Sequence, residues 1–113
     1  MCSRETLENV LKEVMQAYKN VYGNKLVKVV LYGSYARGDY DEESDINIAG
    51  IVKDKRSNIQ KLAKILLKII NDINLKYDVL VSCISIPYDE FIEYRNYLPF
   101  YKNIRKEGFP INV

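Results

Sequence analysis

The fold of this chain is decided by Gly33-Ser34-Tyr35-Ala36-Arg37-Gly38 and, after five further residues, by Ser44-Asp45-Ile46-Asn47. The first run follows the apolar, β-branched segment Leu26 to Tyr32, which is typical of a buried strand. Glycine allows close backbone approach, and the N–H groups at a helix start form an anion site, so a phosphate can bind at Gly33-Ser34. A plain connection between a strand and a helix gives the same pattern, and this turn alone does not separate the two interpretations.

Four polar side chains can complete such a site. Arg37 can hold a second phosphate oxygen through its fork of donors, unless it is simply a solvated surface arginine. Asp45 and Asn47 are expected side by side, because residues i and i+2 of a strand point to the same face. Asp78 interrupts the apolar run Tyr77 to Val81, which we expect to open another strand, and a divalent ion is one candidate partner for its carboxylate. Taken one at a time, Asp45 is better explained as a cap at the start of a strand, and Asp78 as a member of an ion pair. Taken together with the phosphate turn, the same residues indicate a nucleotide site, because such a site needs metal ligands beside the phosphates.

The rest of the chain alternates between helical and strand patterns. Apolar residues at three- and four-residue steps, or proline and glycine at the ends, predict helices over residues 3–22, 57–71, 88–94 and 99–106. Strands are predicted over residues 26–32, 44–52 and 77–86. This order of elements predicts an α/β (α+β) fold, in which a small mixed β-sheet is flanked by helices. The length of 113 residues fits a single domain over residues 1–113.

Composition excludes several kinds of protein. The chain contains no histidine, which rules out every mechanism that depends on imidazole. Its net charge of +2 is too small to indicate a nucleic-acid binder. Cys2 and Cys83 lie far apart and suggest neither a disulfide nor a metal site. The pattern of charges shows no secretory signal and the apolar stretches are too short to span a membrane, so we expect a cytoplasmic protein.

The quoted runs resemble the signature of the minimal nucleotidyltransferases of the polymerase β superfamily: Gly-Ser, a spacer, Asp-x-Asp, and a third acidic residue on a later strand. Residues 98–108 also resemble the way these short domains end. The resemblance implies a polymerase β-like nucleotidyltransferase fold and transfer of AMP from ATP. It also implies roles for individual residues, in which Ser34 and the backbone at Gly33 would grip the phosphates with support from Arg37. Asp45 would bind both Mg²⁺ ions, and Asp78 would help to place the ion that activates the attacking hydroxyl.

Asn47 departs from this pattern, because the family has a second aspartate there. At about 4 Å and an effective dielectric constant of about 20, one pair of unit charges is worth roughly 4 kcal/mol. Water compensates part of the missing charge, so we expect a loss in rate on the order of a hundred- to a thousandfold. Two explanations of Asn47 remain open. One is an engineered inactivating substitution, which is slightly favoured because it keeps the shape of the side chain and removes only its charge. The other is a natural family member that has drifted towards binding.

In the family that this chain resembles, single-domain members of this size accompany a HEPN-type toxin, a helical ribonuclease, and attach AMP to one of its tyrosines. The resemblance therefore implies an antitoxin that uses ATP and Mg²⁺. The alternative is a catalytically degenerate antitoxin that neutralises its partner by binding alone. Antibiotic-modifying or nucleic-acid-extending activity is disfavoured, because those relatives carry an added domain and because the acidic loop Asp39 to Glu43 would repel a polynucleotide.

The stretch from Tyr94 to Lys106 is rich in tyrosine and carries basic residues. Aromatic and arginine side chains are favoured at interface cores, so this stretch is a candidate docking surface for the partner. The equally weighted alternative is that its tyrosines only pad the core.

Overall fold

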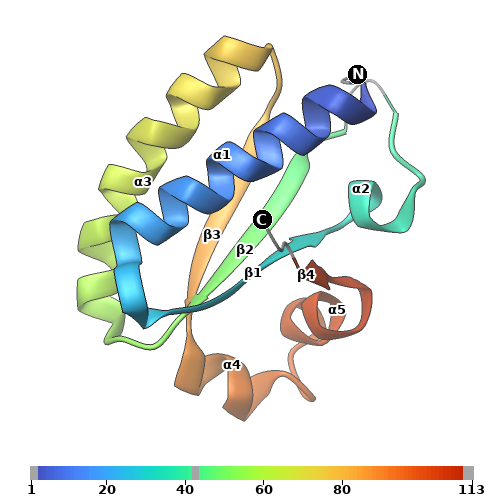
Figure 1. Cartoon of the computed structure of the whole chain (residues 1–113). Coiled ribbons are helices and arrows are strands. Elements are labelled where there is room, and N and C mark those ends of the chain that lie inside the picture. Colours follow the sequence, from blue (N-terminus) through green and yellow to red (C-terminus); the bar gives the residue numbers. More distant parts are fainter. Residues whose placement is uncertain (1–2, 42–43, 111–113) are drawn as a thin grey trace.

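The computed structural model describes residues 3–41 and 44–110. The elements follow in the order α1 (Arg4–Tyr22), η1 (Gly23–Lys25), β1 (Leu26–Tyr32), α2 (Ser34–Arg37), β2 (Ile46–Val52), α3 (Arg56–Tyr77), β3 (Val81–Pro87), α4 (Tyr88–Tyr94), α5 (Pro99–Glu107) and β4 (Phe109–Pro110). The strands form one sheet in the order β3-β2-β1-β4, in which β2 and β3 are parallel and the other pairs are antiparallel. The predicted mixed sheet flanked by helices is confirmed (Figure 1).

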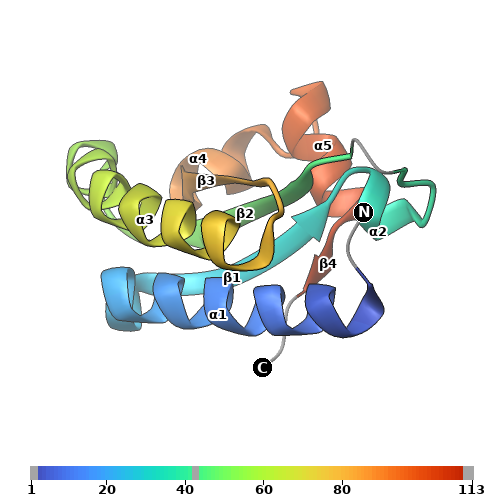
Figure 2. The same cartoon turned by 90° about the horizontal axis from the view of Figure 1, so that it is seen from above.

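Helices cover both faces of the sheet, with α1 on one side and α4 and α5 on the other (Figure 2). The side chains of β2 alternate between these two layers. Ile46 and Ile48 belong to the apolar cluster under α1 and α3, whereas Ala49 and Ile51 belong to the cluster under α4 and α5. Asn47 shares the face of Ala49 and Ile51, because alternate residues of a strand point the same way. The only polar side chain within β2 therefore faces the layer that holds α4 and α5.

Both predicted ends of α1 are confirmed. The Ser3 hydroxyl accepts a hydrogen bond from the Thr6 N–H at 3.1 Å, which makes Ser3 the N-cap. Gly23 ends the helix with φ at 59°, and its N–H donates to the Lys19 carbonyl. A positive φ at this position favours glycine, which is why the helix stops here.

Helix α3 extends further than the sequence pattern predicts, and this changes the placement of Asp78. The helix continues to Tyr77 because Ile73 is buried in the core beneath it. Asn74 then fixes the exit, since its backbone carbonyl accepts the Asp78 N–H and its side-chain oxygen accepts the Val81 N–H at 2.8 Å. Asp78 is the C-cap of α3, with φ at 53° and ψ at 51°, and β3 begins only at Val81. The predicted strand position of Asp78 is therefore wrong.

The strands and cysteines also differ in part from the sequence pattern. Strand β2 begins at Ile46, two residues later than predicted, and the two-residue strand β4, which pairs with Val30 and Leu31, was not predicted. Cys83 is a free, half-buried thiol, whereas Cys2 lies outside the described residues. Within residues 3–41 and 44–110, no helix has the length and hydropathy that a membrane span needs.

Tyr18 of α1 packs closely against Gly50 of β2, and this contact attaches the helix to the sheet. Tyr18 is fully buried, its hydroxyl donates to the Ile84 carbonyl at 2.7 Å, and a Cβ on Gly50 would lie 2.2 Å from its ring. We expect Gly50→Ala to lower the free energy of unfolding by about 1–3 kcal/mol, because the ring must move to make room. Chemical denaturation measures this effect. In a Tyr18→Leu background the same substitution should cost less, and equal costs in both backgrounds would contradict the contact.

Candidate functional site

The Gly33-Ser34 turn and Asn47 lie at the same end of the sheet. Tyr32, the last residue of β1, pairs with Asn47 of β2, so the turn that follows β1 lies beside the start of β2. A Cβ on Gly33 would lie 2.8 Å from Nδ2 of Asn47, and Gly33 has φ at 80°. The backbone conformation therefore favours glycine at this position, and a Cβ here would displace the Asn47 amide. The structure brings Gly33 and Asn47 into direct contact.

Helix α2 is a single turn that begins at Ser34, as predicted. The N–H groups of Ala36 and Arg37 both donate to the Gly33 carbonyl at 3.1 Å. Gly38 ends the turn with φ at 84°, and its N–H donates to the Ser34 carbonyl at 2.9 Å. The Ser34 N–H precedes the first of these donors and is not used by the helix. The turn therefore presents Ser34 at the start of α2, beside Gly33.

Two contacts after Ser34 hold the loop that carries Arg37. The exposed Arg37 side chain forms an ion pair with Asp39, with Nε 3.2 Å from the carboxylate. Tyr35 is buried, and its ring stacks on that of Tyr40 with centroids 4.3 Å apart and planes at 5°. The sequence reasoning missed this stack, although the two aromatic residues that bracket Arg37 could have signalled it. A phosphate at Arg37 would have to compete with Asp39.

Asp45 lies one residue before β2 and is half-buried. The loop before it is closed by hydrogen bonds between Asp41 and Ser44: the Asp41 N–H donates to the Ser44 hydroxyl at 2.9 Å, and the Ser44 N–H and hydroxyl donate to the Asp41 carbonyl and carboxylate, each at 3.2 Å. After it, the Ile46 N–H donates to the Leu80 carbonyl at 2.9 Å. These bonds hold Asp45 at the edge where β2 meets the approach to β3. Residues 42 and 43 of the acidic loop lie outside the described residues.

The strand register leaves Asp78 outside the row that contains Asn47. On β3 the residue beside Asn47 is Ser82, and Asp78 lies four positions earlier, exposed at the end of α3. Across the described ranges, no three Asp, Glu, Cys or His side chains are grouped as potential metal ligands. The structure thus brings Gly33, Ser34 and Asn47 together at one end of the sheet, and Asp45 lies two residues before Asn47 in the sequence. A metal-binding role for Asp78 stays a prediction.

Helix α5 begins beside this end of the sheet. The Tyr32 ring meets the Phe100 ring edge-on, with centroids 5.6 Å apart and planes at 86°. Burial raises the pKa of the Tyr32 phenol, so this side chain remains neutral at physiological pH. The first turn of α5 therefore lies against the residue that directly precedes Gly33.

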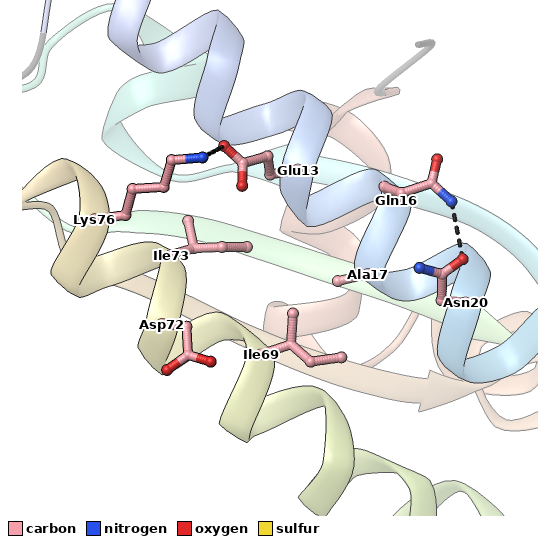
Figure 3. Close-up of a pocket in the computed structure, with 8 residues that line it drawn as sticks. All are labelled: Glu13, Gln16, Ala17, Asn20, Ile69, Asp72, Ile73 and Lys76. Carbon is pink, nitrogen blue, oxygen red and sulfur yellow. Dashed lines mark hydrogen bonds and ion pairs between the residues drawn. The ribbon is translucent and has the colours of Figure 1, made fainter.

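A pocket of about 270 Å³ lies elsewhere, between α1 and α3 (Figure 3). Its lining combines apolar side chains with a polar rim: Glu13, Gln16, Ala17, Asn20, Ile69, Asp72, Ile73 and Lys76. Two contacts close the rim, an ion pair from Lys76 to Glu13 at 3.0 Å and a hydrogen bond from Gln16 to Asn20 at 2.9 Å. The pocket includes none of the predicted site residues, and its two helices pack on the face of the sheet opposite Asn47. We therefore do not place the nucleotide there.

Residues 7–112 match the family model described as a nucleotidyltransferase domain, and this chain belongs to that family. The resemblance seen in the signature residues is confirmed. Two Methanocaldococcus jannaschii proteins, each named "Putative protein adenylyltransferase", are similar along most of their length. One is 35% identical over 101 residues, which cover 89% of this chain and 93% of the relative. The other is 41% identical over 73 residues, which cover 65% of this chain and 72% of the relative.

Solved structures share the fold. One, described as "Structure of putative minimal nucleotidyltransferase", has a TM-score of 0.56 and 22% identity and covers 94% of this chain and 93% of that chain. Another, described as "Crystal structure of the toxin-antitoxin with AMP-PNP", has a TM-score of 0.57 and 18% identity and covers 90% of this chain and 72% of that chain. The predicted minimal nucleotidyltransferase fold is thereby confirmed.

Proposed function

We propose that this chain transfers AMP from ATP to a tyrosine of a partner protein, a HEPN-type toxin, and thereby acts as its antitoxin. The observation that carries the proposal is the contact of Asn47 with the Gly33-Ser34 turn, beside Asp45, in a member of the nucleotidyltransferase domain family. The names of the relatives as protein adenylyltransferases support a protein as acceptor, and a toxin–antitoxin assembly with AMP-PNP shares the fold. The single domain over residues 1–113 and a cytoplasmic location are part of this proposal.

The phosphates of ATP would lie at the Gly33-Ser34 turn. The Ser34 N–H and hydroxyl can donate to phosphate oxygens, and the absence of a side chain at Gly33 allows the backbone to approach them closely. Arg37 lies one turn later and can exchange its ion pair with Asp39 for a phosphate oxygen. Such an exchange replaces one carboxylate partner with another anion, so it leaves the guanidinium paired.

The oxygen donors at this edge fit Mg²⁺, which takes one or two carboxylates together with substrate phosphates and water. The Asp45 carboxylate and the Asn47 side-chain oxygen would hold it, and Asp78 is a third candidate from the end of α3. When bound, Mg²⁺ neutralises charge that develops on the transferred phosphoryl group. The neutral amide at position 47 supplies a ligand atom without the charge, so we expect weak activity.

The reaction joins the tyrosine to the α-phosphate. The phenolic oxygen of the acceptor attacks the α-phosphorus of ATP and forms a new P–O bond. The bond from the α-phosphorus to the oxygen that bridges to the β-phosphate breaks, pyrophosphate leaves, and the phenolic proton passes to solvent. On the toxin, the added AMP is a bulky anion that would repel RNA.

The second candidate is an antitoxin that neutralises its partner by contact alone. Asn47 favours it, because one carboxylate of the signature is missing, and so does the placement of Asp78 outside β3. The nucleotide pocket would then be a remnant that takes no part in catalysis.

Mass spectrometry of a co-expressed partner tests the proposal. Candidate partners are helical ribonucleases from the same genome, each produced with the chain as it stands and with its Asn47→Asp and Asp45→Asn variants. We expect AMP on a tyrosine of the partner with Asn47→Asp, little with the unaltered chain, and none with Asp45→Asn. A partner that is silenced but unmodified with every variant would establish the contact-only antitoxin. A partner that is neither modified nor silenced would overturn both candidates.

A further inference from the structure

The turn between α4 and α5 exposes four large apolar side chains, which we call the aromatic turn: Tyr94, Tyr97, Leu98 and Phe100. Their exposed fractions are 40%, 76%, 44% and 45%. The turn has a defined shape, because the N–H groups of Tyr97 and Leu98 both donate to the Tyr94 carbonyl, at 2.9 and 3.0 Å. Several large apolar side chains exposed on one short, ordered segment are typical of an interaction site.

Apart from Phe100, which contacts the rings of Tyr32 and Tyr101, the packing in this region comes from residues outside the aromatic turn. Phe91 of α4 and Ile104 of α5 are buried in the second core cluster. The Tyr101 hydroxyl donates to Glu90 at 2.8 Å, which ties α5 to α4. Within the stretch from Tyr94 to Lys106, Tyr101 packs against this cluster, whereas Tyr97 remains three-quarters exposed. The aromatic turn is fixed on the protein by other side chains and keeps its own apolar surface available.

The aromatic turn is continuous with the candidate site. Phe100 meets Tyr32 edge-on, and Tyr32 both precedes Gly33 and pairs with Asn47. Figure 1 shows α5 and α2 on the same side of the molecule, and Figure 2 agrees. A protein segment seated on the aromatic turn would therefore end beside the residues proposed to hold ATP.

The charged residues from Tyr94 to Arg105 are all basic, whereas Glu93 directly precedes the turn and Glu90 contacts Tyr101. Residues 94–105 include Arg95, Lys102 and Arg105 and contain no aspartate or glutamate. After α2, by contrast, the chain carries Asp39 and Asp41. A second copy docked turn to turn would bring two basic surfaces together, and a polynucleotide that passed the site would meet these carboxylates. An acidic protein segment fits the basic side without either repulsion.

We propose that the aromatic turn, with Arg95, Lys102 and Arg105, binds the acceptor protein through an acidic, tyrosine-bearing segment. This inference rests on the proposed function, because it assumes that the acceptor is a protein. Aromatic and leucine side chains of the turn supply apolar contact, and the three cations select acidic neighbours of the tyrosine.

Binding of a random copolymer of glutamate and tyrosine, measured by fluorescence anisotropy without ATP, tests the surface independently of catalysis. Two double variants remove its two features: Tyr97→Ser with Leu98→Ser, and Lys102→Glu with Arg105→Glu. Matched controls lie on α3, far from the turn: Leu75→Ser, at a side chain 83% exposed, and Lys64→Glu with Lys68→Glu. We expect each surface variant to weaken binding by about tenfold or more and the controls to change it little.

Three results would overturn the surface proposal. If the charge-reversal variants on α5 and on α3 weaken binding of the copolymer equally, the binding depends on the net charge of the protein and not on the aromatic turn. Binding of single-stranded oligothymidylate but not of the copolymer would make the turn a nucleic-acid surface. Self-association that the Tyr97→Ser/Leu98→Ser variant abolishes would make it an interface between copies of this chain. Copolymer binding that depends on the turn, without any AMP on the partner, would instead preserve the surface and reject the proposed transfer.

Discussion

Replacing Asn47 with aspartate is expected to raise the rate of AMP transfer on the order of a hundredfold, and by no less than about tenfold. The added carboxylate would lie against Gly33, beside Asp45, where the charge of a magnesium-bound nucleotide is proposed to sit. Aspartate and asparagine have nearly the same shape, so the contact with Gly33 survives the change. Release of pyrophosphate from ATP in the presence of the unmodified partner measures the rate.

The matched control adds the same charge elsewhere. Asn20 lies on the rim of the pocket between α1 and α3, so Asn20→Asp should leave the rate unchanged. A readout without turnover is available as well, since Asn47→Asp should increase the rise in melting temperature that Mg²⁺ with ATP produces. An Asn47→Asp variant that is no faster and gains no metal-dependent stability would show that position 47 is not a metal ligand.

Replacing Asp45 should lower the rate of AMP transfer, and by a larger factor than the Asn47→Asp change raises it. In the Asn47→Asp background, Asp45→Asn is expected to lower AMP transfer by about a thousandfold or more, because the proposed metal then loses the carboxylate at the start of β2. The same pyrophosphate assay measures the loss. The fold should not change, because Asp45 is half-buried and lies outside the strand ladder.

Asp72 provides the comparison for this loss. It is an exposed carboxylate in the pocket between α1 and α3, and Asp72→Asn should be as active as its parent. Should Asp72→Asn abolish transfer while Asp45→Asn retains it, the nucleotide would bind in that pocket and the proposed site would be wrong.

Local signals determined most of what could be predicted from the sequence. The cap at Ser3, the glycine at position 23 and the β-branched run before Gly33 each act over a few residues, and the elements that they define were found where expected. The helix start expected at the Gly33-Ser34 turn is likewise found, with α2 beginning at Ser34.

Features that depend on distant partners were not predictable in this way. Residues 77–81 have strand composition, but burial of Ile73 extends α3 and leaves Asp78 at its end. The fit of Tyr18 against Gly50 joins elements that are far apart in the sequence. Strand β4 is two residues long and is defined by its pairing with β1 alone. Local composition carries no information about such pairings.

The backbone conformation of Asp78 bears on the stability of the protein and on the role proposed for this residue. Among residues 3–41 and 44–110, it is the only residue other than glycine with a positive φ. Glycine would adopt this conformation freely, whereas an aspartate there costs roughly 1 kcal/mol of backbone energy. An Asp78→Gly variant would therefore be the more robust protein, and the carboxylate is held in a conformation that works against the fold. With the metal-binding role proposed for Asp78, stability and activity would be in tension at this position, and selection for thermal resistance alone would tend to remove Asp78 while leaving the sheet unchanged.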